Sequence, residues 1–176
     1  MGKIKEWAST GFILSSAAGT VLHFVYGWFG ALIPVMILGA VNESVWEHLK
    51  LLFWPVFIFS IIEFIVWGYL KTGFLYARIL AACCGMAFIV VVFYTYSGIL
   101  GRSFVPVDIA LFFVAVAITF RLSTFFLKRN FFESLLFQIL GWVLAAFLVF
   151  VFIRFTFFPP GIPLFEPASM GCCRFL

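Results

Sequence analysis

The chain has 176 residues, of which 65% are hydrophobic and 10% are charged, and 27 of them are phenylalanine. A water-soluble domain of this size is excluded, because one compact core cannot bury so much apolar surface. The formal net charge of +4 comes from basic residues scattered singly or in pairs, so nucleic acid is not an expected partner.

Apolar stretches of about 20 residues have the length of membrane-spanning helices. They predict an all-α, polytopic membrane helical bundle that forms a single transmembrane domain, residues 1–176. The five expected spans are residues 10–29, 43–70, 76–99, 107–127 and 131–155. Residues 30–41 are apolar but too short to cross a bilayer, which predicts a re-entrant or interfacial segment. The proline-rich residues 158–176 predict an external tail without a further spanning helix.

The first span combines small residues with one strongly polar side chain. Ser15 and Gly19 have the four-residue spacing that lets membrane helices approach closely. His23 follows one turn later and is expected near the far end of this span.

The second span begins with the most polar stretch of the chain, Asn42-Glu43-Ser44-Val45-Trp46-Glu47-His48-Leu49-Lys50. Two carboxylates, an imidazole and an ammonium group fall within eight residues here and nowhere else. Such groups are costly to place near lipid and therefore mark functional sites in membrane proteins. The sequence predicts a site at this position, with Glu43, Glu47 and His48 as candidate catalytic residues.

An alternative interpretation of this stretch is a capped helix start in the wet membrane interface. Asn42 or Ser44 suits the N-cap position, and Ser44 with Glu47 has capping-box spacing. On a helix that begins near Asn42, Glu43 and Glu47 share one stripe while Ser44 and His48 share another. A cap needs one carboxylate, however, and this stretch carries two together with a histidine and a lysine.

His23, Glu47 and His48 are candidate metal ligands if the first two spans bring them together. Imidazole and carboxylate groups suit zinc, iron or manganese, so a divalent transition metal is the candidate cofactor. The spacing does not match a His-Glu-x-x-His or Glu-x-x-His pattern. The same groups would also serve as a proton relay, because histidine changes its charge near neutral pH.

Further polar residues distant in sequence are expected in the same layer of the bundle. The candidate substrate-binding residues are Lys50, Tyr94, Asp108 and Arg154. In an enzyme, a carboxylate would be the general base, His48 the acid or metal ligand, and Arg154 the clamp for an anion.

Glu63 lies deep in the second span and predicts a structural ion pair, because an unpaired carboxylate is costly there. Arg78 and Arg121 are the arginines expected at similar depth, and we assign Arg121 as the partner.

Three segments together carry a family resemblance: residues 42–50, residues 94–98 with Asp108-Ile109, and residues 160–165. They resemble an uncharacterised family of small bacterial multi-pass membrane proteins, mainly from Gram-positive organisms. The Asn-Glu-Ser-x-Trp-Glu-His pattern of the first segment is the most specific part. The resemblance spans most of the chain and implies a bacterial membrane protein of this size, without implying any chemistry.

The basic residues predict the orientation of the bundle in the membrane. One side carries Lys3, Lys5, Lys71, Arg78, Lys128 and Arg129, and the other carries Lys50, Arg102, Arg154 and Arg174. We therefore expect a plasma membrane protein with a cytoplasmic N-terminus and an external C-terminus. The polar stretch then lies in the outer half of the bilayer.

Three functional hypotheses fit these observations. The first is a polar Glu/His site in the outer leaflet, able to hold a metal and to bind or act on a lipid or small polar ligand. The second is a proton-coupled transporter or channel, expected to form a homo-oligomer, with the outer cluster and Glu63 as successive proton sites. The third is a non-catalytic membrane assembly subunit in which the polar stretch is only a helix cap.

Overall fold

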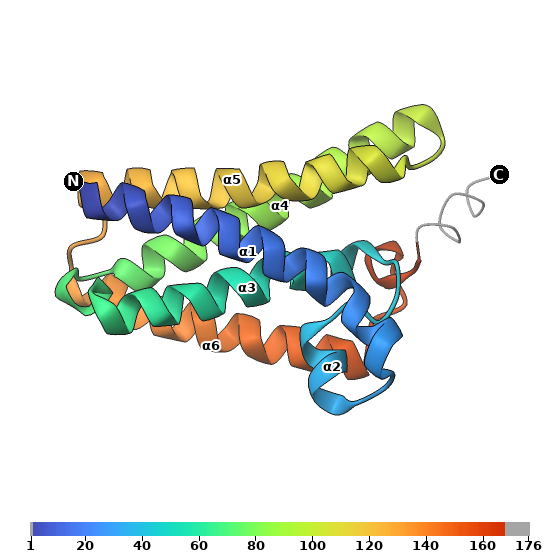
Figure 1. Ribbon diagram of the computed structural model, residues 1–176, viewed down its shortest axis with the longest axis horizontal. Helices are drawn as coiled ribbons and strands as arrows, with labels where there is room; N and C mark the ends of the chain where they lie inside the picture. The colour runs from blue at the N-terminus through green and yellow to red at the C-terminus, as the bar shows by residue number, and fades with distance from the viewer. Residues whose placement is uncertain (1, 168–176) are drawn as a thin grey trace.

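A computed structural model describes residues 2–167 and consists of helices joined by short turns (Figure 1). In chain order these are α1 (Gly2–Phe29), α2 (Ile33–Leu38), α3 (Val45–Val66), the 3-10 helix η1 (Gly68–Leu70), α4 (Phe74–Leu100), α5 (Val105–Arg129), α6 (Leu135–Phe157) and the 3-10 helix η2 (Pro163–Phe165). Five of them, α1, α3, α4, α5 and α6, are long and apolar enough to cross a membrane. The predicted helical bundle with five spans is confirmed, and the short α2 lies where the re-entrant or interfacial segment was expected.

The helix bounds differ from the expected spans mainly at polar residues. α1 begins at Gly2 instead of residue 10, because the helix-forming Lys3, Lys5 and Glu6 continue it outward. The second span changes to the 3-10 helix η1 after Val66, and α6 begins only after Ser134, whose backbone is extended. Residues 168–176 of the expected tail lie outside the described residues.

α3 is the central helix of the bundle. It packs against α1 and α4, and α4 in turn packs against α5 and α6. In the most apolar stretch of α3, 61% of the residues are buried, against 17% in α1 and in α6. Its residues Leu52, Phe53 and Val56 are fully buried in the main core. Side chains on α3 are therefore positioned by every other long helix, directly or through α4.

The small residues of α1 allow close helix packing. Ser15 and Gly19 are both buried. A Cβ atom added at Gly19 would lie 2.6 Å from the Leu51 carbonyl oxygen of α3, so a larger residue there would push α1 outward. This contact fixes the height at which His23, one turn later on α1, faces the start of α3.

Large apolar side chains are exposed on all five long helices, among them Ile13, Ile65, Val91, Val114 and Phe147. Such a surface is unfavourable in water and suitable in a bilayer. The described helices therefore indicate a lipid environment.

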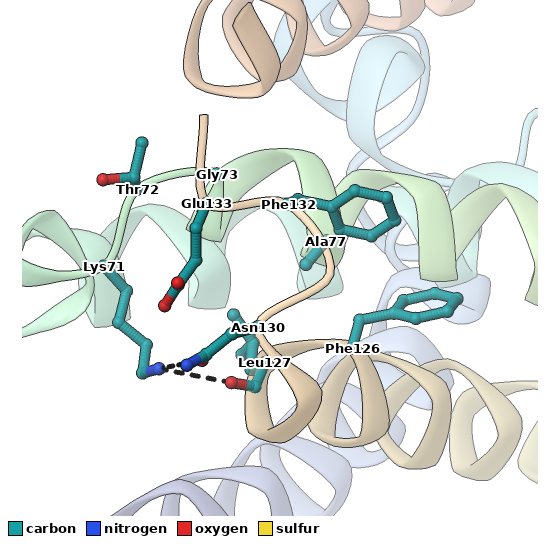
Figure 2. A pocket seen from close by; sticks show the side chains of 9 residues that line it. All are labelled: Lys71, Thr72, Gly73, Ala77, Phe126, Leu127, Asn130, Phe132 and Glu133. Carbon is teal, nitrogen blue, oxygen red and sulfur yellow. Dashed lines mark hydrogen bonds between the residues drawn. The ribbon is translucent and has the colours of Figure 1, made fainter. Parts of the chain in front are cut away.

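The two ends of the bundle differ. The motif end consists of residues 30–44, 101–104 and 158–167, and the opposite end contains Gly2 with residues 67–73 and 130–134 (Figure 1). At the opposite end, Lys71 connects two turns of the chain (Figure 2). Its Nζ donates to the Asn130 Oδ1 atom at 2.7 Å and to the Leu127 carbonyl at 3.2 Å. Gly73 has a positive φ of 71° and lies against the Phe132 backbone, which a side chain at this position would strike. The small pocket between these residues, about 10 Å³, has room for about one water molecule.

Candidate metal site at the motif end

The start of α3 is set by a chain of local hydrogen bonds. The Asn42 side chain accepts a hydrogen bond from the Ser44 backbone N–H at 2.9 Å. Ser44 is then the N-cap, with an extended backbone, and its hydroxyl accepts from the Glu47 N–H at 3.3 Å. The helix therefore begins at Val45, and Glu43 lies before it instead of on the helical stripe that the sequence predicted for Glu43 and Glu47.

His23, Glu43 and His48 form a cluster between α1 and the start of α3. One nitrogen or oxygen atom from each lies within 4.8 Å of the others. Glu43 Oε1 is 3.9 Å from His23 Nε2, and Glu43 Oε2 is 3.6 Å from His48 Nε2. The two imidazole rings have centroids 5.4 Å apart. The Glu43 side chain is 70% exposed and the histidines about one third, so the cluster is accessible from outside.

The His48 ring is oriented by the helix cap. Its Nδ1 atom lies 2.8 Å from the Ser44 carbonyl oxygen. Because a carbonyl only accepts, Nδ1 is the donor, and the Nε2 atom of the neutral ring keeps its lone pair. That lone pair is on the side of Glu43. Metal-binding histidines are oriented by a second hydrogen bond of this kind.

Glu47, which the sequence placed among the metal ligands, has a different environment. It is buried, and its Oε2 atom lies 2.6 Å from Lys50 Nζ and accepts a hydrogen bond from the Val41 N–H at 2.8 Å. Lys50 is also buried and donates to the Met36 carbonyl of α2 and to Thr156 of α6. The carboxylate beside the two histidines is that of Glu43, while Glu47 and Lys50 join α2, α3 and α6.

The tail returns to the start of α3. Phe165 of η2 packs on Trp46, with ring centroids 4.7 Å apart, and on Phe155. Ser44 and Pro167 form an isolated antiparallel β-bridge. The tail therefore packs against the cap that orients His48.

The comparison with protein families covers almost the whole chain. The sequence profile of a family of unknown function, DUF6512, matches residues 1–173. The chain belongs to this family. No curated protein and no solved structure shows significant similarity to it. Membership in DUF6512 agrees with the uncharacterised family that the sequence resembles, and it assigns no activity.

The other residues predicted to bind a substrate are spread over the motif end of this DUF6512 protein. Asp108 accepts a hydrogen bond from the Tyr96 hydroxyl. Tyr94 is 39% exposed and packs edge-on against Phe93. The Arg154 guanidinium lies over the Phe158 ring, 4.1 Å from its centroid. Among the described residues, the ligand atoms that converge are those of His23, Glu43 and His48, and none of these three predicted substrate-binding residues is among them.

Glu63 is paired, but with a different arginine from the one assigned. Glu63 Oε2 lies 2.5 Å from Arg78 Nη2, and Arg78 Nη1 donates to Ser123 at 2.5 Å. Both charged side chains are fully buried, whereas Arg121 is exposed on α5. The assignment of Arg121 is therefore corrected to Arg78, which the sequence offered as the other arginine at this depth.

Sequence reasoning missed three parts of this arrangement. It did not predict the hydrogen bond from Tyr96 to Asp108. The Ser44 carbonyl orients His48, and Glu43 replaces Glu47 beside the histidines. The last two follow from taking Ser44 as the sole N-cap, because Glu43 then lies before the first helical residue and His48 lies one turn after the cap.

Proposed function

We propose that this protein is an integral membrane metal protein in which His23, Glu43 and His48 hold a divalent transition metal. The observation that carries the proposal is the convergence of their three ligand atoms within 4.8 Å, together with the bond from His48 Nδ1 to the Ser44 carbonyl. A helix cap needs neither histidine. The α1 histidine in particular has no role in capping α3.

The distances suit a metal of the size of zinc. Ligand bonds of about 2.0–2.2 Å at the tetrahedral angle place two ligand atoms about 3.4 Å apart. The two nitrogen-to-oxygen distances, 3.6 Å and 3.9 Å, exceed this by a few tenths of an ångström. Closing the set requires rotation of the exposed Glu43 side chain and of the histidine rings, whose nitrogens lie within 4.8 Å of each other. Two imidazoles and one carboxylate also suit ferrous iron, so metal analysis decides between the two ions.

Three protein ligands leave at least one coordination position for water or for an oxygen atom of another molecule. A metal with such a position acts as a Lewis acid and lowers the proton affinity of bound water. The proposed function is therefore a metal site that binds or acts on a polar or lipid-linked molecule.

We place this site in the outer half of the plasma membrane, with the N-terminus in the cytoplasm. The support is the distribution of lysine and arginine in the sequence, since basic residues are enriched in short cytoplasmic loops.

A proton pathway between the two ends has less support. Glu47, one carboxylate of its expected outer site, is paired with Lys50, and Glu63 is paired with Arg78. Leu52, Phe53 and Val56 lie between these pairs on α3 and are fully buried among apolar side chains.

The test is zinc binding by the full-length protein in detergent, measured by elemental analysis and by titration against a chelating dye. We expect stoichiometric zinc in the wild type and an affinity at least about 100-fold lower in His48→Ala and in Glu43→Gln, because each loses a direct ligand. Glu133→Gln is the matched control, since it removes an exposed carboxylate from the opposite end. Equal zinc affinity in all four proteins, or no binding of zinc or iron by the wild type, would overturn the proposal.

A further inference from the structure

Glu43, the proposed carboxylate ligand, belongs to a short loop and not to a helix. The loop follows Gly39, the C-cap of α2, and ends at Val45, the first residue of α3. Asn42 and Glu43 are both exposed on it. An exposed loop has conformational freedom that is lost when one of its side chains is held by a ligand. Contacts that fix the loop in advance therefore raise the affinity for a metal.

The chain after Glu43 is fixed by the start of α3. The Ser44 carbonyl accepts a hydrogen bond from the His48 N–H at 3.2 Å. The Ser44 backbone also pairs with Pro167 in the β-bridge, and the residue is buried. These are backbone contacts, so they do not depend on the Ser44 hydroxyl.

The chain before Glu43 is fixed by the buried side chain of Glu47. Its Oε2 atom accepts a hydrogen bond from the Val41 N–H, six residues earlier, at 2.8 Å. In a capping box the corresponding glutamate bonds to the N–H of the N-cap residue. Here the Ser44 N–H is already bonded to Asn42, and Glu47 reaches past it. The bond from Val41 to Glu47 therefore encloses Glu43.

Lys50 holds the Glu47 carboxylate in this position. Its Nζ atom lies 2.6 Å from the same Oε2 atom and also donates to the Met36 carbonyl at 2.8 Å and to the Thr156 hydroxyl at 3.2 Å. These three acceptors use all three N–H groups of the ammonium. Lys50 is fully buried. The segment from Met36 to Val41 is thus tied to α3 at both of its ends.

We infer that Glu47 is the positioning residue for the metal ligand Glu43 and that Lys50 holds Glu47 in place. This inference rests on the proposed metal site. It gives the buried pair a part in metal affinity, although the ligand atoms that converge among the described residues are those of His23, Glu43 and His48.

The experiment compares zinc binding by two double variants of the full-length protein in detergent, Glu47→Gln/Lys50→Met and Glu47→Leu/Lys50→Met. Both remove the two charges, so they have the same net charge and neither leaves a buried charge without a partner. The glutamine keeps a side-chain oxygen that accepts from the Val41 N–H, whereas the leucine has none. In a chelator-competition titration, the leucine variant is expected to bind zinc about tenfold or more weakly, as on loss of other groups that orient a metal ligand.

The same comparison in a Glu43→Gln background separates positioning from general destabilisation. Because Glu47 acts through Glu43, the difference between the two double variants is expected to fall below about twofold once that ligand is gone. A difference that persists undiminished would overturn the positioning role. Ser123→Ala is the matched control, since it removes a buried hydrogen-bond acceptor of Arg78 and is expected to lower stability without changing zinc affinity.

A measurement on the metal-free wild type tests the enclosing bond without any substitution. Hydrogen exchange of the Val41 amide, followed by NMR, is expected to be at least about tenfold slower than that of an unstructured amide. Exchange at the unstructured rate would overturn the inference whether or not the variants fold.

The outcomes distinguish this inference from the proposed function. Equal zinc affinities of the two double variants would overturn the positioning role and leave the metal site standing. A wild-type protein that binds neither zinc nor iron would overturn both.

Discussion

Two groups of ionisable side chains, toward the two ends of α3, are built in opposite ways. Glu63 and Arg78 are fully buried and lie 2.5 Å apart, with Ser123 on the second guanidinium nitrogen. His23, Glu43 and His48 are partly exposed, the Glu43 carboxylate lies 3.6–3.9 Å from the two histidines, and one imidazole is oriented by a backbone carbonyl. Close pairing in the interior supports the fold, whereas open spacing near water leaves lone pairs available to a ligand.

The largest effect is expected from breaking the buried pair. Arg78→Leu leaves the Glu63 carboxylate without its partner inside the bundle and is expected to lower the free energy of unfolding by about 3–5 kcal/mol. The double variant Glu63→Leu/Arg78→Leu is expected to recover much of this loss, because no charge then remains buried. Thermal unfolding in detergent measures both, with the exposed Arg121→Leu as control. Equal stability of Arg78→Leu and Arg121→Leu would contradict the pairing.

The Glu47–Lys50 pair should behave like the interior pair, although it belongs to the polar stretch. Lys50→Met leaves Glu47 buried without its cation and removes the bonds to Met36 and Thr156. We expect a loss of about 3 kcal/mol in unfolding free energy. Lys71→Met, whose bond to Asn130 is exposed, is expected to cost about 1 kcal/mol or less. If Lys50→Met lost no more unfolding free energy than Lys71→Met, the Glu47–Lys50 pair would not support the fold as the interior pair does.

The helix cap separates stability from metal binding. Ser44→Ala removes the hydroxyl that accepts from Glu47 N–H and is expected to cost about 1 kcal/mol of stability. The backbone carbonyl that orients His48 remains, so zinc affinity is expected to change by less than about threefold, roughly 0.65 kcal/mol. Chelator-competition titration and thermal unfolding of one sample measure the two quantities. A zinc affinity that falls tenfold or more would mean that the hydroxyl itself supports the site.

The smallest effect on stability is expected at the exposed carboxylate. In metal-free buffer, the free energy of unfolding of Glu43→Gln is expected to lie within about 0.5 kcal/mol of the wild-type value. Exposed ion pairs contribute little to stability. Glu47→Gln, four residues later, replaces a buried partner of Lys50 and should be clearly less stable. Denaturation of both variants with excess chelator makes the comparison, and equal losses would show that Glu43 also has a structural role.

The number of spans could be predicted from the sequence because long apolar stretches leave few alternatives to membrane helices. The partner of Glu63 could not be predicted from the sequence. α4 is apolar on all sides, so the sequence gives no face by which to orient Arg78 relative to Arg121 on α5.

The position of the polar stretch was also predictable, but not which of its carboxylates meets the histidines. Periodicity places Glu43 and Glu47 together only if the helix begins before Glu43. The bond from Ser44 N–H to Asn42 forms a turn before the cap, so the helix begins only at Val45 and Glu43 is outside it. The approach of His23 depends on close packing of α1 on α3 at Gly19, which is a tertiary contact.

The most direct test of the proposed metal site is X-ray absorption at the zinc edge of the loaded full-length protein. We predict a shell of nitrogen and oxygen atoms at about 2.0–2.2 Å with the scattering signature of two imidazoles, and of one imidazole in His23→Ala. A spectrum without imidazole scattering, or one that neither His23→Ala nor His48→Ala changes, would contradict the assignment of these residues as ligands.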